Sequence, residues 1–256
     1  MDQFKQRLKQ SKPLIGTLVT LGLPAISEMI SACGFDWLWI DMEHGPLSLE
    51  QVQQLLQAKD DRCAGFVRIP INDDVYIKRV LDLGADGIIV PQVNTAEEAR
   101  RAVAASKYPP TGTRSVGIAR AHGFGINFAN YVQEANDRLL VILQIEHIDA
   151  VKNLESILAI PGVDAIIIGP YDLSGSFGKL GQIHDSQVQE AIETVHKACK
   201  KQAMPIGIFA LQPEQARTYL KQGYDMVALG IDVHYLWTAA KAGLASALSD
   251  ASDGGA

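Results

Sequence analysis

A short pattern that would join a helix to a strand recurs four times along the chain. Each copy consists of Gly, any residue, Asp and an apolar run: GFDWLWID (34–41), GADGIIVP (84–91), GVDAIIIG (162–169) and GYDMVALG (223–230). Amphipathic helical stretches run up to three of these glycines, and the stretch before Gly162 ends in Pro161. Glycine suits the left-handed residue that closes a helix, and an unbroken apolar run suits a strand covered on both faces. The repeat therefore predicts helix-to-strand connections in a buried parallel sheet.

Four further apolar segments alternate with these copies: LIGTLVT (14–20), GFVRI (65–69), LLVILQI (139–145) and PIGIF (205–209). Each is followed by a helical pattern, which brings the count to eight strand–helix pairs. Strands that alternate with helices at this spacing are typically parallel and joined by right-handed crossovers. Eight such units in about 250 residues predict an α/β protein with the (β/α)8 architecture of a TIM barrel. A doubly wound open sheet is the alternative, but its ligands gather at one topological switch, whereas polar residues here follow many strands.

The length and composition favour one large domain. A chain of 256 residues with 47% apolar residues can bury the core of a single barrel. We expect this domain to cover residues 1–248 and the small, polar segment SDASDGGA (249–256) to be disordered. Residues 108–136, which include YPPTGTRSVG, are interpreted as an extended loop with a short helix.

The charge and the cysteines exclude several kinds of partner. Acidic residues outnumber basic ones by 29 to 23, and the basic residues are scattered, which argues against nucleic acid. Cys33, Cys63 and Cys199 form no CxxC pair, so neither a disulfide framework nor a thiolate metal site is expected. No apolar run approaches the roughly 18 residues of a membrane span, and the amino terminus does not resemble a signal peptide. We therefore expect a cytoplasmic protein with no membrane partner.

Polar side chains follow five of the predicted strands. In a TIM barrel the loops after the strands share one face, so residues distant in sequence meet there. In chain order these residues are Asp41, Glu43, His44, Arg68, Gln92, Gln144, Glu146 and Asp172.

Glu146 and Asp172 follow adjacent strands and are candidate metal ligands. Two carboxylates can hold a hard divalent cation, such as magnesium or manganese, and leave positions open for water and substrate. The alternative is that each carboxylate only caps a helix or a turn. Two buried acids side by side would repel unless a cation lay between them, which favours the metal site.

Asp41 and His44 are three residues apart and are candidates for proton transfer. The acid could accept a hydrogen bond from one ring nitrogen and leave the other free to move protons, although DMEHG could also be a solvent-facing turn. Arg68 must face either a structural carboxylate or an anionic ligand.

These groups suit carbon–carbon lyase chemistry. A cation that chelates two oxygens of a 2-oxo acid acidifies the adjacent carbon, and an arginine nearby can stabilise the enolate. The histidine can remove a proton from a 4-hydroxyl group during cleavage and return it during condensation. No lysine ends a predicted strand, which disfavours a Schiff-base aldolase.

At these same residues the sequence resembles the metal-dependent (class II) pyruvate aldolases of the HpcH/HpaI family. The likeness covers residues 14–248 and includes, in family order, GFDWLWIDMEHGP, VRIP, LDLGADGIIVPQV, YPPTGTRSVG, QIEHIDAVKN and GVDAIIIGPYDLSGSFG. It implies reversible cleavage of a 4-hydroxy-2-oxo acid into pyruvate, or a close 2-oxo acid, and an aldehyde.

The resemblance also implies a role for each site residue. Glu146 and Asp172 would ligate Mg²⁺, Mn²⁺ or Co²⁺, with Zn²⁺ also compatible, and no other cofactor is implied. His44 held by Asp41 would be the acid/base. The substrate-binding residues would be Arg68, Gln144, Gly169, Pro170, Tyr171 and Asp172, of which Arg68 would steady the enolate and the 169–172 main chain would seat the pyruvate carboxylate.

The family resemblance further implies a homo-oligomer, a hexamer built from dimers or trimers, with the last helix (IDVHYLWTAAKAGLASAL) exchanged between subunits. His147 and Tyr171 replace residues that are often Thr and Ala in the family, so the aldehyde stays unassigned. Two alternatives stay open. One is a lyase acting on a coenzyme A thioester, against which the sequence shows no obvious basic cluster. The other is a non-catalytic barrel that binds a metal–oxoacid complex and would not need the set of Asp41, His44 and Arg68.

Overall fold

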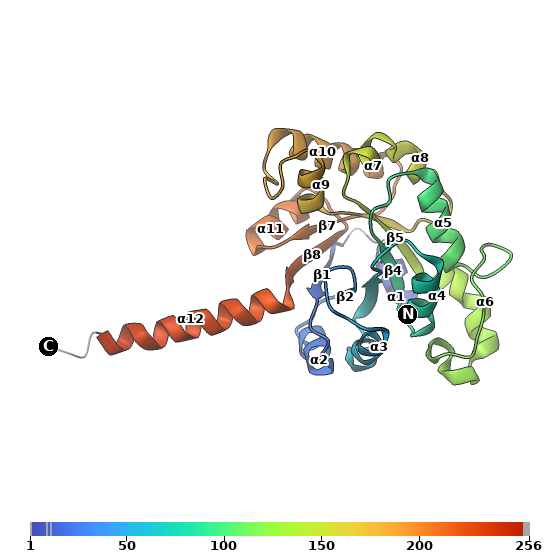
Figure 1. The fold of residues 1–256 in the computed structure, drawn as a ribbon, viewed down its shortest axis with the longest axis horizontal. Coiled ribbons are helices and arrows are strands. Elements are labelled where there is room, and N and C mark those ends of the chain that lie inside the picture. The colour runs from blue at the N-terminus through green and yellow to red at the C-terminus, as the bar shows by residue number, and fades with distance from the viewer. Residues whose placement is uncertain (1, 9, 11, 253–256) are drawn as a thin grey trace.

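Eight parallel strands close into a barrel in the computed structural model, which describes residues 2–8, 10 and 12–252 (Figure 1). The strands are β1 (Leu14–Val19), β2 (Trp37–Asp41), β3 (Ala64–Arg68), β4 (Gly87–Val90), β5 (Leu140–Ile145), β6 (Ala165–Ile168), β7 (Ile206–Ala210) and β8 (Met226–Ile231). Each strand pairs with the next, and β8 pairs with β1. The predicted TIM barrel is therefore confirmed, and the open sheet is excluded because a closed ring has no edge strands.

Helices alternate with the strands, and all but the last lie around the barrel (Figure 1). They are α1 (Asp2–Leu8), α2 (Pro24–Ala32), α3 (Leu49–Ala58), α4 (Asp74–Asp82), α5 (Ala96–Ser106), η1 (Arg120–Gly125), α6 (Phe128–Arg138), α7 (Ile148–Lys152), α8 (Leu154–Leu158), α9 (Pro170–Ser176), α10 (Ser186–Lys201), α11 (Pro213–Lys221) and α12 (Asp232–Ser252). Among the described residues, none of these helices is long and apolar enough to cross a membrane.

The four copies of the Gly-X-Asp pattern lie at the end of the barrel where the strands begin. Its glycines all adopt left-handed backbone angles, with φ between +86° and +96°, as the sequence predicted. The aspartates of the pattern have a structural role that the sequence did not reveal. Each accepts a hydrogen bond from the main-chain N–H at the start of a neighbouring strand: Asp36 from Ile15, Asp86 from Gly65, Asp164 from Val141 and Asp225 from Ile206. These bonds of 2.8–2.9 Å fix neighbouring strands to one another at the face opposite the loops after the strands.

Two apolar layers hold the barrel together. Trp37, Trp39 and Phe66 fill part of its interior, where the two indole rings stack with centroids 6.2 Å apart. A larger cluster lies between the outer faces of the strands and the helices. Burial of both strand faces explains the unbroken apolar runs in the sequence.

The carboxyl-terminal helix α12 leaves the end of β8 and projects away from the barrel (Figure 1). It continues through Ser252, so it extends four residues past the predicted domain boundary at 248. Residues 253–256 of the predicted disordered tail lie outside the described part of the chain. The assignment of residues 1–248 to one domain stays a prediction.

Candidate active site

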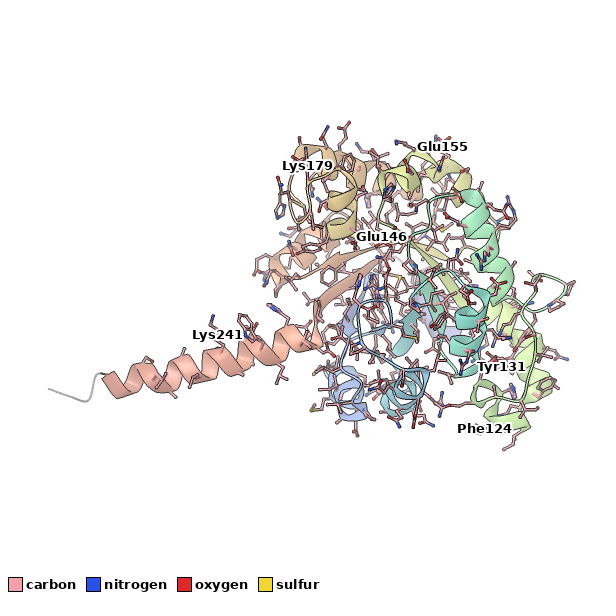
Figure 2. All side chains as sticks on the ribbon, in the orientation of Figure 1. Phe124, Tyr131, Glu146, Glu155, Lys179 and Lys241 are labelled. Atoms are coloured by element: carbon pink, nitrogen blue, oxygen red, sulfur yellow. The ribbon has the colours of Figure 1, made fainter. Side chains whose placement is uncertain are left out.

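A cavity of about 640 Å³ lies within the ring of loops that follow the strands. Its wall includes Asp41, His44, Arg68, Gln144 and the segment 169–172. These residues come from β2, β3, β5 and β6 and the loops after them, as the barrel geometry predicted. Glu146 is buried just after β5, close to the middle of the barrel in Figure 2. The structure therefore brings the predicted site residues together at one end of the barrel.

Arg68 and Asp41 form a buried, two-pronged ion pair. They are opposite each other in the register of β2 and β3, so their side chains leave the sheet together. Arg68 Nε donates to Asp41 Oδ1 at 2.9 Å, and Nη2 donates to Oδ2 at 2.6 Å. The guanidinium also lies over the ring of Trp39, 5.0 Å from its centroid. Both charged groups are almost inaccessible to water, with 5% of Arg68 and 1% of Asp41 exposed, so each stabilises the other.

The predicted bond between Asp41 and the His44 ring is wrong, because Arg68 engages both oxygens of Asp41. Asp41 Oδ1 additionally accepts hydrogen bonds from the main-chain N–H groups of Glu43 and His44, and these bonds shape the loop after β2. The ring of His44 turns to solvent, with 62% of its side chain exposed. Its Nε2 lies 3.8 Å from Glu43 Oε2.

Glu43 is a site residue to which the sequence pattern assigned no role. Its Oε2 lies 3.0 Å from Arg68 Nη1 but has no hydrogen-bond partner of good geometry among the described residues. Burial raises the pKa of Glu43, whereas the charges of Arg68 and His44 lower it. The sequence placed Glu43 among the polar residues that follow β2. The direction of its side chain, however, depends on the turn that the hydrogen bonds of Asp41 hold in place.

Glu146 is held by two donors from neighbouring strand ends. Its Oε1 accepts a 2.8 Å hydrogen bond from the main-chain N–H of Gln92, and its Oε2 accepts one from the side chain of Gln144. Gln92 has a φ of +54°, an unusual left-handed angle for a residue with a side chain, in the segment that directs this N–H at Glu146. The carboxylate is 2% exposed, and burial raises its pKa to about 7. The Gln92 N–H opposes this rise in pKa, and the negative charges of Glu43 and Asp172 add to it.

Asp172 lies in the first turn of α9, directly after β6, with its side chain exposed. It raises the pKa of both Glu146 and Glu43, so the three carboxylates are close enough to repel one another. Gly169 leaves room beside them. A Cβ at Gly169 would lie 2.8 Å from both Glu146 Oε2 and Gln144 Nε2, too close for any other residue without displacement of these groups.

His147 does not point into the site. It caps α7, where its Nδ1 accepts a 3.1 Å hydrogen bond from the main-chain N–H of Asp149. His147 therefore caps the amino terminus of α7, and it is next to the buried Glu146 in the chain. Within residues 2–8, 10 and 12–252, no group of three or more His, Cys, Asp or Glu side chains is arranged to hold a metal ion. A metal site here would use two protein ligands and fill its other positions from water or substrate.

A closed parallel barrel whose strand ends deliver buried acids and an arginine to one cavity is the architecture of a barrel enzyme. The chain belongs to the HpcH/HpaI aldolase/citrate lyase family, whose model matches residues 15–239. It is 43% identical over 229 residues to the 2-dehydro-3,6-dideoxy-6-sulfogluconate aldolase of Pseudomonas putida, with 88% of each chain covered. It is 40% identical over 243 residues to a 4-hydroxy-2-oxo-heptane-1,7-dioate aldolase of Escherichia coli, with 94% of this chain and 93% of that one covered.

A solved structure confirms the arrangement of the elements. The HpcH/HpaI aldolase/citrate lyase family protein from Burkholderia cenocepacia J2315 superposes with a TM-score of 0.93 at 35% identity, covering 96% of this chain and 99% of that one. Together with the named relatives, this places the chain among the carbon–carbon lyases: it is an enzyme of the aldolase class.

Proposed function

We propose that this enzyme is a divalent-metal-dependent pyruvate aldolase. It would reversibly cleave a 4-hydroxy-2-oxo acid into pyruvate, or a close 2-oxo acid, and an aldehyde. The observation that carries the proposal is that Arg68 and Asp172 line one cavity at the carboxyl ends of the strands and both act electrostatically on the buried Glu146 carboxylate.

The acids fit a hard divalent cation. Glu146 and Asp172 present carboxylate oxygens, the donors that Mg²⁺, Mn²⁺ and Co²⁺ accept, and Zn²⁺ also binds such groups. The pKa of about 7 for Glu146 reflects burial and repulsion from Glu43 and Asp172, which a cation would relieve. When bound, the cation supplies Lewis-acid polarisation of the 2-oxo group.

The surrounding residues would bind and orient the 2-oxo acid. Arg68 uses Nε and Nη2 on Asp41, which leaves Nη1 facing Glu43 and, at 3.4 Å, Gln144 Oε1. This fixed, buried donor can stabilise negative charge as the enolate forms. The first turn of α9 leaves main-chain N–H groups of Tyr171 and Asp172 without partners inside the helix, and they can receive the pyruvate carboxylate.

His44 would carry the proton of the 4-hydroxyl group. Its ring lines the cavity and is also open to solvent, so a proton taken from the substrate can be exchanged with water. Asp41 contributes indirectly, because its bonds to the main chain of Glu43 and His44 set the conformation from which the ring projects. The Glu43 carboxylate lies 3.8 Å from the ring, on the side of Nε2.

The aldehyde partner is set by the part of the cavity that the acids and Arg68 do not occupy. Tyr171 and Phe209 form one side of it, with their ring centroids 6.1 Å apart. The two relatives are named for different substrates, so we propose only the general class, a small 2-oxo acid and an aldehyde. Lyases that act on a coenzyme A thioester remain the rival within the enzymes, and a metal–oxoacid sensor the rival outside them.

One experiment distinguishes these functions. Metal-stripped protein is incubated with pyruvate and each of succinic semialdehyde, glycolaldehyde and hydroxypyruvate, and Mg²⁺, Mn²⁺ or Co²⁺ is then restored. We expect metal-dependent condensation with at least one aldehyde. A parallel incubation with malyl- and citryl-coenzyme A tests the thioester rival. Metal binding with no turnover of any of these substrates would favour the sensor and end the aldolase proposal.

We also propose that α12 packs against another copy of this chain in a homo-oligomer, a hexamer built from dimers or trimers. Leu236, Trp237, Leu244 and Leu248 on this projecting helix are each more than half exposed, which is unfavourable for an isolated protomer. Light scattering measures the mass in solution. Substitution of Trp237 and Leu244 by Glu should lower the mass to that of a smaller assembly, whereas an unchanged mass would contradict the role of α12.

A cytoplasmic location completes the proposal. Cys63 and Cys199 are buried free thiols, and burial raises the pKa of both to about 12, so neither is prepared to form a disulfide. Cell fractionation tests this location directly.

A further inference from the structure

The carboxylate of Asp232 ties the loop after β1 to the start of α12. Asp232 is 4% exposed and is the first residue of α12. Its Oδ2 accepts hydrogen bonds from the main-chain N–H groups of Thr20 at 2.9 Å and Leu21 at 2.8 Å. Its Oδ1 accepts from the Thr20 hydroxyl and from the N–H of Val233, both at 2.8 Å. One side chain therefore satisfies four donors that are brought together where β8 pairs with β1.

The four hydrogen bonds of Asp232 join two segments that form one wall of the cavity. Thr20, Leu21 and Gly22 line the cavity, and so do Ile231 and Val233, the two residues that flank Asp232. The wall therefore consists of both segments that the Asp232 carboxylate holds together. Its side chains are mostly apolar, which suits contact with a carbon chain.

The part of this wall that follows β1 lies across the barrel from Glu146. In the closed ring, β1 is four strands from β5 in either direction, and β5 leads to Glu146. The loop after β1 is thus as far around the ring from Glu146 as a strand end can be. A 2-oxo acid held near Glu146, Asp172 and Arg68 would extend its remaining carbon atoms toward this opposite wall.

We propose that Asp232 is a positioning residue that fixes the loop 20–22 as the wall of the aldehyde subsite. The proposal rests on the proposed aldolase function, because it divides the cavity into a 2-oxo acid half and an aldehyde half. Asp232 acts through Thr20 and Leu21 and holds them rigid. Loss of the carboxylate frees three main-chain N–H groups and a hydroxyl, which lets the wall move while Glu146, Asp172 and Arg68 stay in place.

The test compares Asp232→Ala and Asp232→Asn with wild type in two reactions. Condensation of pyruvate with an accepted aldehyde requires both halves of the cavity. Exchange of the pyruvate methyl protons with deuterated water, followed by NMR without aldehyde, requires only the 2-oxo acid half. We expect Asp232→Ala to raise the aldehyde KM by roughly tenfold to a hundredfold, the scale on which small misplacements weaken a productive complex. The exchange rate should stay within about twofold of wild type, since the hydrogen bonds of Asp232 go to Thr20, Leu21 and Val233 rather than to Glu146 or Arg68. Asp232→Asn keeps one acceptor oxygen and should have a smaller effect.

A readout independent of turnover follows the loop itself. Hydrogen–deuterium exchange of the Thr20 and Leu21 amides should be faster in Asp232→Ala than in wild type, because these N–H groups lose their acceptor. Asp73→Ala is the matched control: Asp73 accepts two main-chain N–H bonds at the start of α4, and its pocket is a different one. This control should change neither the aldehyde KM nor exchange at Thr20 and Leu21. Thr20→Val, which removes one of the four bonds, replaces Asp232→Ala if that variant does not fold, and it should raise the aldehyde KM by roughly twofold to fivefold.

The outcomes separate the two proposals. Wild-type protein that shows no metal-dependent pyruvate exchange overturns the aldolase function itself. Wild-type exchange together with an unchanged aldehyde KM in the Asp232 variants overturns the role of Asp232. A parallel loss of exchange and condensation would also overturn it, since the carboxylate would then support the whole cavity rather than one half.

Discussion

Substitution of Glu146 by Gln should remove a loss of stability that the metal-free protein suffers as the pH rises. Burial and the nearby acids raise the pKa of Glu146 from 4.5 to about 7. The folded protein therefore keeps a proton that the unfolded chain has already released between these two pH values. Because the folded state binds more protons there, its stability falls as the pH rises through that window.

The size of this effect follows from the displaced pKa. A pKa moved from 4.5 to about 7 corresponds to about 3 kcal/mol at 1.36 kcal/mol per pH unit, and most of this stability would be lost between pH 5 and pH 8. The amide introduced by Glu146→Gln has no proton to lose, so this variant should gain about this much stability relative to wild type across the same range. The neutral amide loses some hydrogen bonding to Gln144, but that loss does not depend on pH.

Urea unfolding at pH 5, 6, 7 and 8 in the presence of a chelator measures the difference. Glu155→Gln, an exposed glutamate on α8, is the control and should run parallel to wild type (Figure 2). Added Mn²⁺ should invert the order, because an ion at a hundred times its Kd stabilises wild type by about 2.7 kcal/mol. Parallel curves for wild type and Glu146→Gln in chelator would refute the argument that burial raises the pKa of this acid.

Three further substitutions test other parts of the site. Arg68→Lys cannot form the two-pronged pair with Asp41, and it should lower kcat by roughly a hundredfold with little change in metal affinity; a kcat near wild type in steady-state assays would contradict the role of the guanidinium. Gly169→Ala places a methyl group against Glu146, so the metal Kd measured by calorimetry should rise roughly tenfold to a hundredfold, and an unaltered Kd would show that the acid is not a ligand. His44→Ala should keep the ion bound but slow condensation by roughly 10²- to 10⁴-fold; loss of the ion in this variant would mean that the roles are misassigned.

Local sequence features were sufficient to predict the barrel. The left-handed glycines and the apolar strands that are buried on both faces each depend on a few consecutive residues. These features and their spacing can therefore be recognised without knowledge of tertiary contacts. The position of each polar residue at a strand end was equally legible. The barrel topology then guaranteed that Arg68, Glu146 and Asp172 would share one face.

The partners of these residues could not be read in the same way. The register of β2 and β3 places Arg68 opposite Asp41, 27 residues earlier in the chain, and this pair excludes the expected bond from Asp41 to the His44 ring. Glu43 is also oriented by a contact that the sequence does not show, because its carboxylate lies beside Arg68.

The sequence by itself determined the closed parallel barrel and the set of polar residues at its mouth, because backbone conformation and burial pattern are local properties. Only the tertiary structure decided which of those residues pair, that Glu146 is buried with a pKa of about 7, and that Asp232 holds Thr20 across 212 residues where the last strand closes on the first. Hydrogen bonds and ion pairs depend on distances between atoms, and those distances are fixed only when the ring is closed.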